Sequence, residues 1–254
     1  MQLNFTAYGD GHPLILIHGF LGALDNWRTM SKRLATRFRV YAIDLRNHGH
    51  SPHRAVMNFA VMARDVREFL DQQKVLSAFV LGHSLGGKVA MQTALEFPAR
   101  IDKLIVADIA PKAYAPSQRG LIEALRQLNV SALRTYADAD TELAPAITGR
   151  ALRQFLIKNL ERSDSAFRWR IPLDILTANY EELIKAISSD KTFDKPVCFL
   201  RGEHSNYLDE SDLAQIRELF PRAELRTIAN SGHWLHIDAP DAFFRNISAF
   251  LDAP

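Results

Sequence analysis

The stretch "VLGHSLGG", Val80–Gly87, determines how the rest of the sequence is interpreted. It fits the pattern G-x-S-x-G with Gly82, Ser84 and Gly86, after an apolar run and before a helical pattern. In this pattern a serine stands on a sharp strand-to-helix turn, and the glycines let strand and helix pass closely. We therefore expect Ser84 to be a nucleophile. The alternative is a glycine-rich turn in which the serine is incidental.

Short apolar runs recur on both sides of this stretch, and each has a Gly, Asp or His at or near its end. They occupy residues 14–19, 39–45, 78–84, 103–110 and 196–202, with a weaker run at 223–233. Runs of this kind are typical of strands buried on both faces. Helical patterns lie between them, for example at residues 59–73 and 240–252. The alternation predicts an α/β fold, a mostly parallel doubly wound sheet with helices on both faces.

Residues 111–193 interrupt this alternation. Three segments there have helical periodicity, at residues 119–130, 144–160 and 172–188, and no buried-strand run separates them. We therefore expect a core formed by residues 1–110 and 194–254, and a helical cap formed by residues 111–193 that covers the ends of the strands.

Composition narrows the classes of protein. The 254 residues are 47% hydrophobic and 24% charged, with a formal net charge of +2 and no basic run. We therefore expect no nucleic-acid partner and no insertion into a membrane. The N-terminus carries no signal-peptide pattern, and Cys198, the one cysteine, excludes an intramolecular disulfide. We expect a cytoplasmic protein; its oligomeric state does not follow from the sequence.

Several motifs together resemble the α/β-hydrolase superfamily, and the resemblance extends over essentially the whole chain. They are "HGFLG" (18–22), "DLRNHGHSP" (44–52), "GHSLGG" (82–87) and "GHW" (232–234). The segments at residues 42–66 and 106–114 ("VADIAPKAY") more narrowly resemble the YbfF-type esterases. That resemblance implies cleavage of acyl esters, with acyl thioesters as a further substrate class.

The resemblance also implies the other parts of a hydrolase site. The backbone N–H groups of Phe20 and Leu85 would hold the developing oxyanion, although the loop at residues 16–22 could be a simple glycine turn. His233 follows a glycine late in the chain, after Ser84 in sequence order, and would be the general base. We expect His236 to pack or to cap a helix.

The place where this family commonly carries its catalytic acid holds Ser205 here, in the loop after the apolar run at residues 196–202. Other acids lie nearby. Glu203 follows the strand too soon, whereas Asp209 and Glu210 fit the first turn of a helix.

Asp108 offers a carboxylate one strand upstream. An aspartate at the carboxyl end of a parallel strand faces the edge where sites form, and a buried carboxylate needs a partner such as Nδ1–H of His233. We expect Asp108 to be the acid, with Ser205 in a supporting role. The alternative is that Asp108 only binds N–H groups of the following loop. In that case one of the acids after residue 202 would take its place.

Other polar and aromatic residues have weaker signals. His48 and His50 lack a third metal ligand, so we expect no metal site; Asp44 would anchor their loop, and Arg46 would pair with an acid. Five aromatic side chains are candidates to line a substrate pocket, although those in the cap could form its own core. They are Phe167, Trp169, Tyr180, Tyr207 and Trp234.

The sequence thus predicts a serine carboxylesterase or acyl thioesterase that works through an acyl-enzyme on Ser84 and requires no cofactor. Its expected partner is a small acyl ester or thioester. Two rivals remain: a carbon–carbon bond hydrolase or lyase on the same fold, and a hydrolase-like protein that binds a small ligand without turnover.

Overall fold

One large sheet organises the molecule, and the structure, a computed structural model, describes residues 1–163 and 166–253. Within these residues seven strands pair in the order β1-β3-β2-β4-β5-β8-β9. β1 is antiparallel to β3, and every other neighbouring pair is parallel. The strands are β1 (Phe5–Tyr8), β2 (Pro13–Ile17), β3 (Arg39–Ile43), β4 (Ala78–His83), β5 (Ile101–Ala107), β8 (Val197–Gly202) and β9 (Ala223–Ile228).

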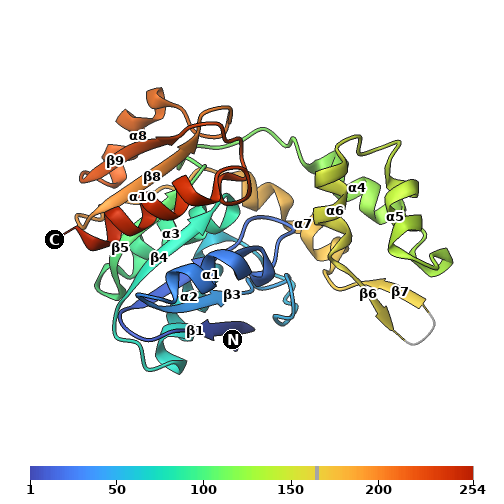
Figure 1. Ribbon diagram of the computed structural model, residues 1–254, viewed down its shortest axis with the longest axis horizontal. Helices are drawn as coiled ribbons and strands as arrows, with labels where there is room; N and C mark the ends of the chain where they lie inside the picture. The colour runs from blue at the N-terminus through green and yellow to red at the C-terminus, as the bar shows by residue number, and fades with distance from the viewer. Residues whose placement is uncertain (164–165, 254) are drawn as a thin grey trace.

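Helices cover both faces of this sheet, which explains the near-continuous apolar runs. Leu14 and Leu16 of β2 pack toward α1 and α10, which lie in front of the strands in Figure 1. Ile15 and Ile17 belong to the core on the other face, with α2 and α3. The predicted fold class is therefore confirmed. These helices are α1 (Arg28–Leu34), α2 (Phe59–Gln72), α3 (Leu85–Glu96) and α10 (Pro240–Asp252).

The chain between β5 and β8 forms a separate group of elements, gathered at the right of Figure 1. It contains four α-helices and a short 3₁₀ helix among the described residues, but it also contains a hairpin that the sequence does not predict. The hairpin strands are short, carry several polar residues and are only partly buried, so they lack an apolar run. The elements are α4 (Arg119–Gln127), α5 (Tyr136–Leu143), α6 (Arg150–Ile157), β6 (Leu160–Ser163), β7 (Ala166–Trp169) and α7 (Leu173–Ile184).

Lys88 joins the two ends of this inserted segment. Its side chain is almost fully buried in α3, and Nζ donates to the carbonyl oxygens of Lys112 at 2.9 Å and of Lys185 at 2.5 Å. Lys112 follows β5, and Lys185 caps the C-terminal end of α7, where a cation is favourable. The helix after Ser84 is thereby tied to both stems of the insertion.

Within the described residues, no helix is long and apolar enough to cross a membrane.

Short elements complete the described chain. The short elements are η1 (Leu24–Trp27), η2 (Pro98–Arg100), η3 (Val130–Ala132), η4 (Glu210–Asp212), α8 (Leu213–Leu219) and α9 (Leu235–Asp238).

Candidate active site

Ser84 lies on the sharp turn between β4 and α3. Its backbone has φ 53° and ψ −119°, a left-handed conformation that is costly for a residue with a side chain. A Cβ added at Gly82 would lie 2.1 Å from the carbonyl oxygen of Gly86, and one at Gly86 would lie 2.4 Å from that of Ile17. Only glycine fits at both places, so the turn holds Ser84 at the carboxyl edge of the sheet.

The loop after β2 lies against this turn. A Cβ built on Gly19 would be 3.3 Å from Cβ of Ser84, which places the backbone before Phe20 beside the serine. Leu85 is the first residue of α3, so its N–H has no carbonyl four residues earlier inside the helix. Phe20 and Leu85 line the same small pocket next to Ser84. The structure therefore places both residues beside Ser84.

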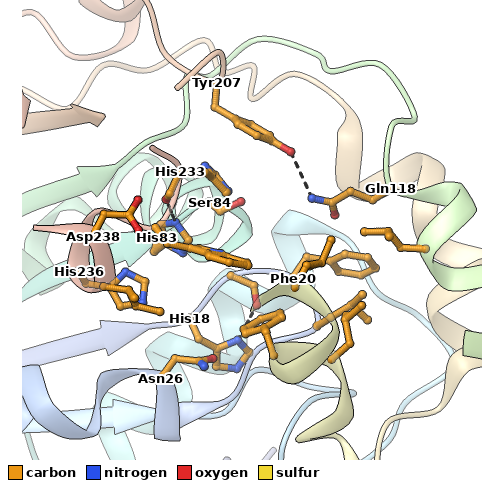
Figure 2. A pocket seen from close by; sticks show the side chains of 18 of the residues that line it. His18, Phe20, Asn26, His83, Ser84, Gln118, Tyr207, His233, His236 and Asp238 are labelled. Atoms are coloured by element: carbon orange, nitrogen blue, oxygen red, sulfur yellow. Dashed lines mark hydrogen bonds between the residues drawn. The ribbon is translucent and has the colours of Figure 1, made fainter. Parts of the chain in front are cut away.

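His233 and Asp108 meet at the same edge. Nδ1 of His233 lies 2.7 Å from Oδ2 of Asp108, and a carboxylate there fixes the proton on Nδ1. Nε2 is then free to accept a proton. Ser84 and His233 line one cavity and lie next to each other in Figure 2. The structure therefore brings together the three side chains that the sequence proposes as nucleophile, base and acid.

Asp108 is fully buried and its carboxylate has three donors. Oδ1 accepts from the N–H of Gly202 at 2.9 Å, and Oδ2 accepts from the hydroxyl of Ser205 as well as from His233. Its backbone also has a positive φ, 53°, just after β5. The described N–H donor to this carboxylate is Gly202, the last residue of β8, rather than a residue of the loop that follows Asp108.

The other acids near β8 have different partners. Glu203 accepts from the N–H of Asn230 at 2.8 Å. Asp209 caps η4 by accepting from the N–H of Ser211 at 3.0 Å, and Glu210 lies 4.0 Å from Arg201. These contacts are consistent with the helix-start interpretation and hold the three carboxylates in roles outside the histidine pair.

His83, directly before Ser84, is a residue whose role the sequence does not reveal. Its Nε2 lies 2.7 Å from the carbonyl oxygen of His233, which can only accept, so the proton is on Nε2. Burial, and next the proximity of His233, hold the pKa of His83 well below its ordinary value. A neutral His83 thus holds the backbone of the base through this hydrogen bond, and the two histidines lie side by side in Figure 2. The sequence feature that could have indicated this role is the position of His83 inside the G-x-S-x-G pattern.

A cavity of about 530 Å³ opens in front of Ser84 and His233. His236 is partly buried in its wall, with 4.8 Å between the centroids of its ring and that of Trp27, and the withdrawal of the imidazole from water lowers its pKa to about 4. Much of the remaining wall is apolar. The apolar lining residues include Leu121, Leu152, Phe155, Leu156, Trp234 and Ile237.

Three of the five aromatic candidates lie at this site. The ring of Tyr207 stacks on that of His233 with 3.9 Å between centroids, and its hydroxyl accepts from Gln118 (Figure 2). Trp234 lines the large cavity, and Tyr180 lines the small pocket beside Ser84.

Phe167 and Trp169 lie elsewhere, because the hairpin that carries them is on the far part of the insertion. Phe167 packs edge-on against Tyr136, and Trp169 lines a separate cavity with residues of α4 and α7. Neither lines the cavities next to Ser84, so the expectation that they contact substrate is corrected. They belong to the insertion's own packing.

The loop after β3 has a structural role. Asp44 accepts from the N–H of Leu24 at 2.7 Å and of His50 at 2.9 Å, and Arg46 forms a buried two-bond pair with Asp65. The predicted pairing of Arg46 is thus confirmed. In the part of the chain that the structure describes, no group of three or more His, Cys, Asp or Glu side chains could hold a metal ion.

A doubly wound sheet with a serine on a left-handed turn after β4 and a histidine–aspartate pair at the same edge defines an α/β hydrolase. Residues 12–240 match the family model described as alpha/beta hydrolase fold, and the chain belongs to this family. The resemblance that the motifs indicate is confirmed.

Individual relatives agree with this family. The chain is 32% identical to Esterase YbfF of Escherichia coli, over 99% of this chain and 100% of the relative. It is 34% identical to sn-1-specific diacylglycerol lipase ABHD11 of Danio rerio, over 97% of this chain and 80% of the relative. A solved structure described as a marine microorganism esterase is 39% identical, with a TM-score of 0.96 over 98% of this chain and 99% of that chain.

Proposed function

We propose that this protein is a serine hydrolase of carboxylic esters, with acyl thioesters as a further substrate class. The observation that carries the proposal is the 2.7 Å contact between His233 Nδ1 and Asp108, which directs Nε2 of the base to its proton-accepting role beside Ser84. The relatives named as esterases and lipases support an ester as the substrate.

The first half of the reaction forms an acyl-enzyme. Oγ of Ser84 attacks the ester carbonyl carbon while its proton passes to Nε2 of His233. The negative charge that develops on the carbonyl oxygen is held by the N–H groups of Phe20 and Leu85. The tetrahedral intermediate collapses, and His233 gives the proton to the departing alcohol or thiol.

The second half releases the acid. A water molecule gives a proton to Nε2 of His233 and attacks the acyl carbonyl, and the proton returns to Oγ of Ser84 as the bond to the serine breaks. The buried Asp108 carboxylate stabilises the imidazolium in both halves. Every proton in this cycle moves between Ser84, His233, water and the leaving group.

The cavity supports an apolar acyl or alcohol chain as the main recognised part of the substrate. A volume of about 530 Å³ with leucine, phenylalanine and tryptophan walls suits a chain of several carbons. Because α6 supplies Leu152, Phe155 and Leu156, the insertion determines which chain lengths fit.

The test is hydrolysis of p-nitrophenyl esters of increasing acyl length, together with labelling by a fluorophosphonate. We expect an adduct on Ser84 and turnover that falls on the order of 10⁶-fold in Ser84→Ala. Folded protein that neither labels at Ser84 nor cleaves any ester would instead support ligand binding without turnover. Cleavage of diketones but not of esters would support the carbon–carbon hydrolase.

A further inference from the structure

A second cavity, of about 380 Å³, lies beside the one that contains Ser84. Leu21, Asn26 and Phe155 line both cavities, so the two share a wall. The rest of the second cavity is formed by the loop after β2 and by the end of α6 with the following hairpin. A substrate that passes Leu21 and Phe155 would therefore place its far end here.

Two cations of the insertion line this second cavity, Lys158 and Arg170. Nη2 of Arg170 donates to the carbonyl oxygen of Lys158 at 3.0 Å, which holds the two residues next to each other. Nη1 of Arg170 lies 3.4 Å from Nε2 of His50. Nε of Arg170 is buried and has no hydrogen-bond partner within the described residues. Because that nitrogen is buried, the guanidinium can offer a ligand only the N–H groups of Nη1 and Nη2, which lie next to His50 and Lys158.

Neither cation has a carboxylate partner among the described residues. Among the ion pairs of residues 1–163 and 166–253, none includes Lys158 or Arg170. By contrast, Arg168 on β7 pairs with Glu161 at 2.7 Å, and Arg153 on α6 pairs with Asp140 at 2.8 Å.

One acid, Asp25, lines this cavity too, in the first turn of η1. It belongs to none of the described ion pairs with Lys158 or Arg170. The formal charge of the lining is therefore +1, from two cations and one carboxylate, and the cations are together on the side of the insertion.

We propose that this second cavity binds an anionic group, a carboxylate or a phosphate, at the far end of the ester substrate. A guanidinium next to an ammonium in the wall of one cavity is suited to such oxygens. The inference rests on the proposed ester hydrolysis and adds to it a charged end opposite the reacting carbonyl. Lys158 and Arg170 then determine specificity without contact to the reacting atoms.

The experiment compares kcat/KM for matched esters of one length. One series carries a neutral hydroxyl, a carboxylate or a phosphate at the far end of the alcohol, and a second carries the same groups at the far end of the acyl chain. We expect at least one anionic ester to exceed its neutral match by about tenfold. The preference should fall as salt rises, because exposed charges are screened.

Substitutions of residues that line the second cavity test whether the preference for anionic esters arises there. Lys158→Ala and Arg170→Gln should each reduce it and leave neutral esters unchanged, whereas Asp25→Asn should increase it. Arg168→Gln is the matched control, since Arg168 is a cation two residues before Arg170 that does not line this cavity, and it should have no effect. The carboxylate and phosphate esters distinguish which anion is bound.

Neutral esters cleaved with no anionic preference, or a preference that survives both cation variants, would overturn the subsite and leave the ester hydrolase intact. Absence of turnover on every ester would instead overturn the proposed function itself. Lys158 is exposed and has no described side-chain bond, so its variant tests the subsite even if Arg170→Gln folds poorly.

Discussion

At the scale of single residues, the position of the acid is the informative feature. The motifs indicate Ser84 and His233 directly, because the chemistry fixes a glycine-flanked serine and a late histidine. Asp108 was predictable only from its place at the end of an apolar run. Its hydrogen bonds to Gly202 and Ser205 depend on how β8 lies beside β5, which no local pattern encodes. His83 was missed because its partner is a backbone carbonyl 150 residues away.

Replacement of Asp108 by Asn tests its role. The amide keeps the size of the side chain but cannot stabilise an imidazolium, and it can favour the wrong tautomer of His233. We expect kcat to fall on the order of 10⁴-fold with little change in fold, measured by ester hydrolysis and circular dichroism. Asp209→Asn is the control and should retain near-normal turnover; a near-normal rate in Asp108→Asn would refute the assignment.

A carboxylate at position 205 should partly replace the one at 108. Ser205 and His233 both contact Oδ2 of Asp108, so a side chain at 205 is within reach of the imidazole region. We expect kcat of the double variant Asp108→Asn with Ser205→Asp to be at least tenfold higher than that of Asp108→Asn alone. Asp108→Asn with Ser205→Asn is the matched control and should recover nothing. Equal rates in the two double variants would show that the acid cannot act from this loop.

At the scale of elements, the strands buried on both faces were predictable and the exposed ones were not. β2, β4, β5 and β8 read as apolar runs because helices cover both of their sides. β1 is a partly buried edge strand, and its residues do not form such a run. The strands of the hairpin β6–β7 pair only with each other in the described sheets, and they do not form apolar runs either. Such strands depend on neighbours rather than on their own composition.

Lys88 offers a test of how the insertion is attached. In Lys88→Met the carbonyl oxygens of Lys112 and Lys185 lose a shared donor, and we expect the free energy of unfolding to fall by roughly 2 kcal/mol. Limited proteolysis should also cut the chain faster near these two stems. Lys32→Met, an exposed lysine of α1, is the control. Unchanged stability and cleavage in Lys88→Met would mean that packing alone holds the stems.

At the scale of the whole molecule, the buried histidines should make stability depend on pH. Burial lowers the pKa of His48 to about 3 and of His236 to about 4, and it also lowers that of His18 and His83. Below the ordinary histidine pKa the unfolded chain takes up protons that the folded chain refuses. The contribution of these histidines to the free energy of unfolding is therefore fully present above about pH 6.5, and it is lost as the pH falls toward 4.

The contribution of His236 can be measured separately. It amounts to about 3 kcal/mol once the pH is below the folded pKa. We expect urea unfolding to show a steep loss of stability between pH 7 and pH 5, and a shallower loss in His236→Phe, whose ring cannot be protonated. His12→Phe, at an exposed histidine, should keep the steep slope. A slope that is the same in His236→Phe and the unsubstituted protein would contradict this account.

The joint departure and return of the insertion at Lys112 and Lys185, held by one ammonium, has an evolutionary consequence. The chain between these two points contributes no strand to the seven-stranded sheet and none of the three side chains Ser84, His233 and Asp108. Selection can therefore change the substrate selectivity set by the insertion without changing the side chains that cleave the ester. The two properties can evolve almost independently.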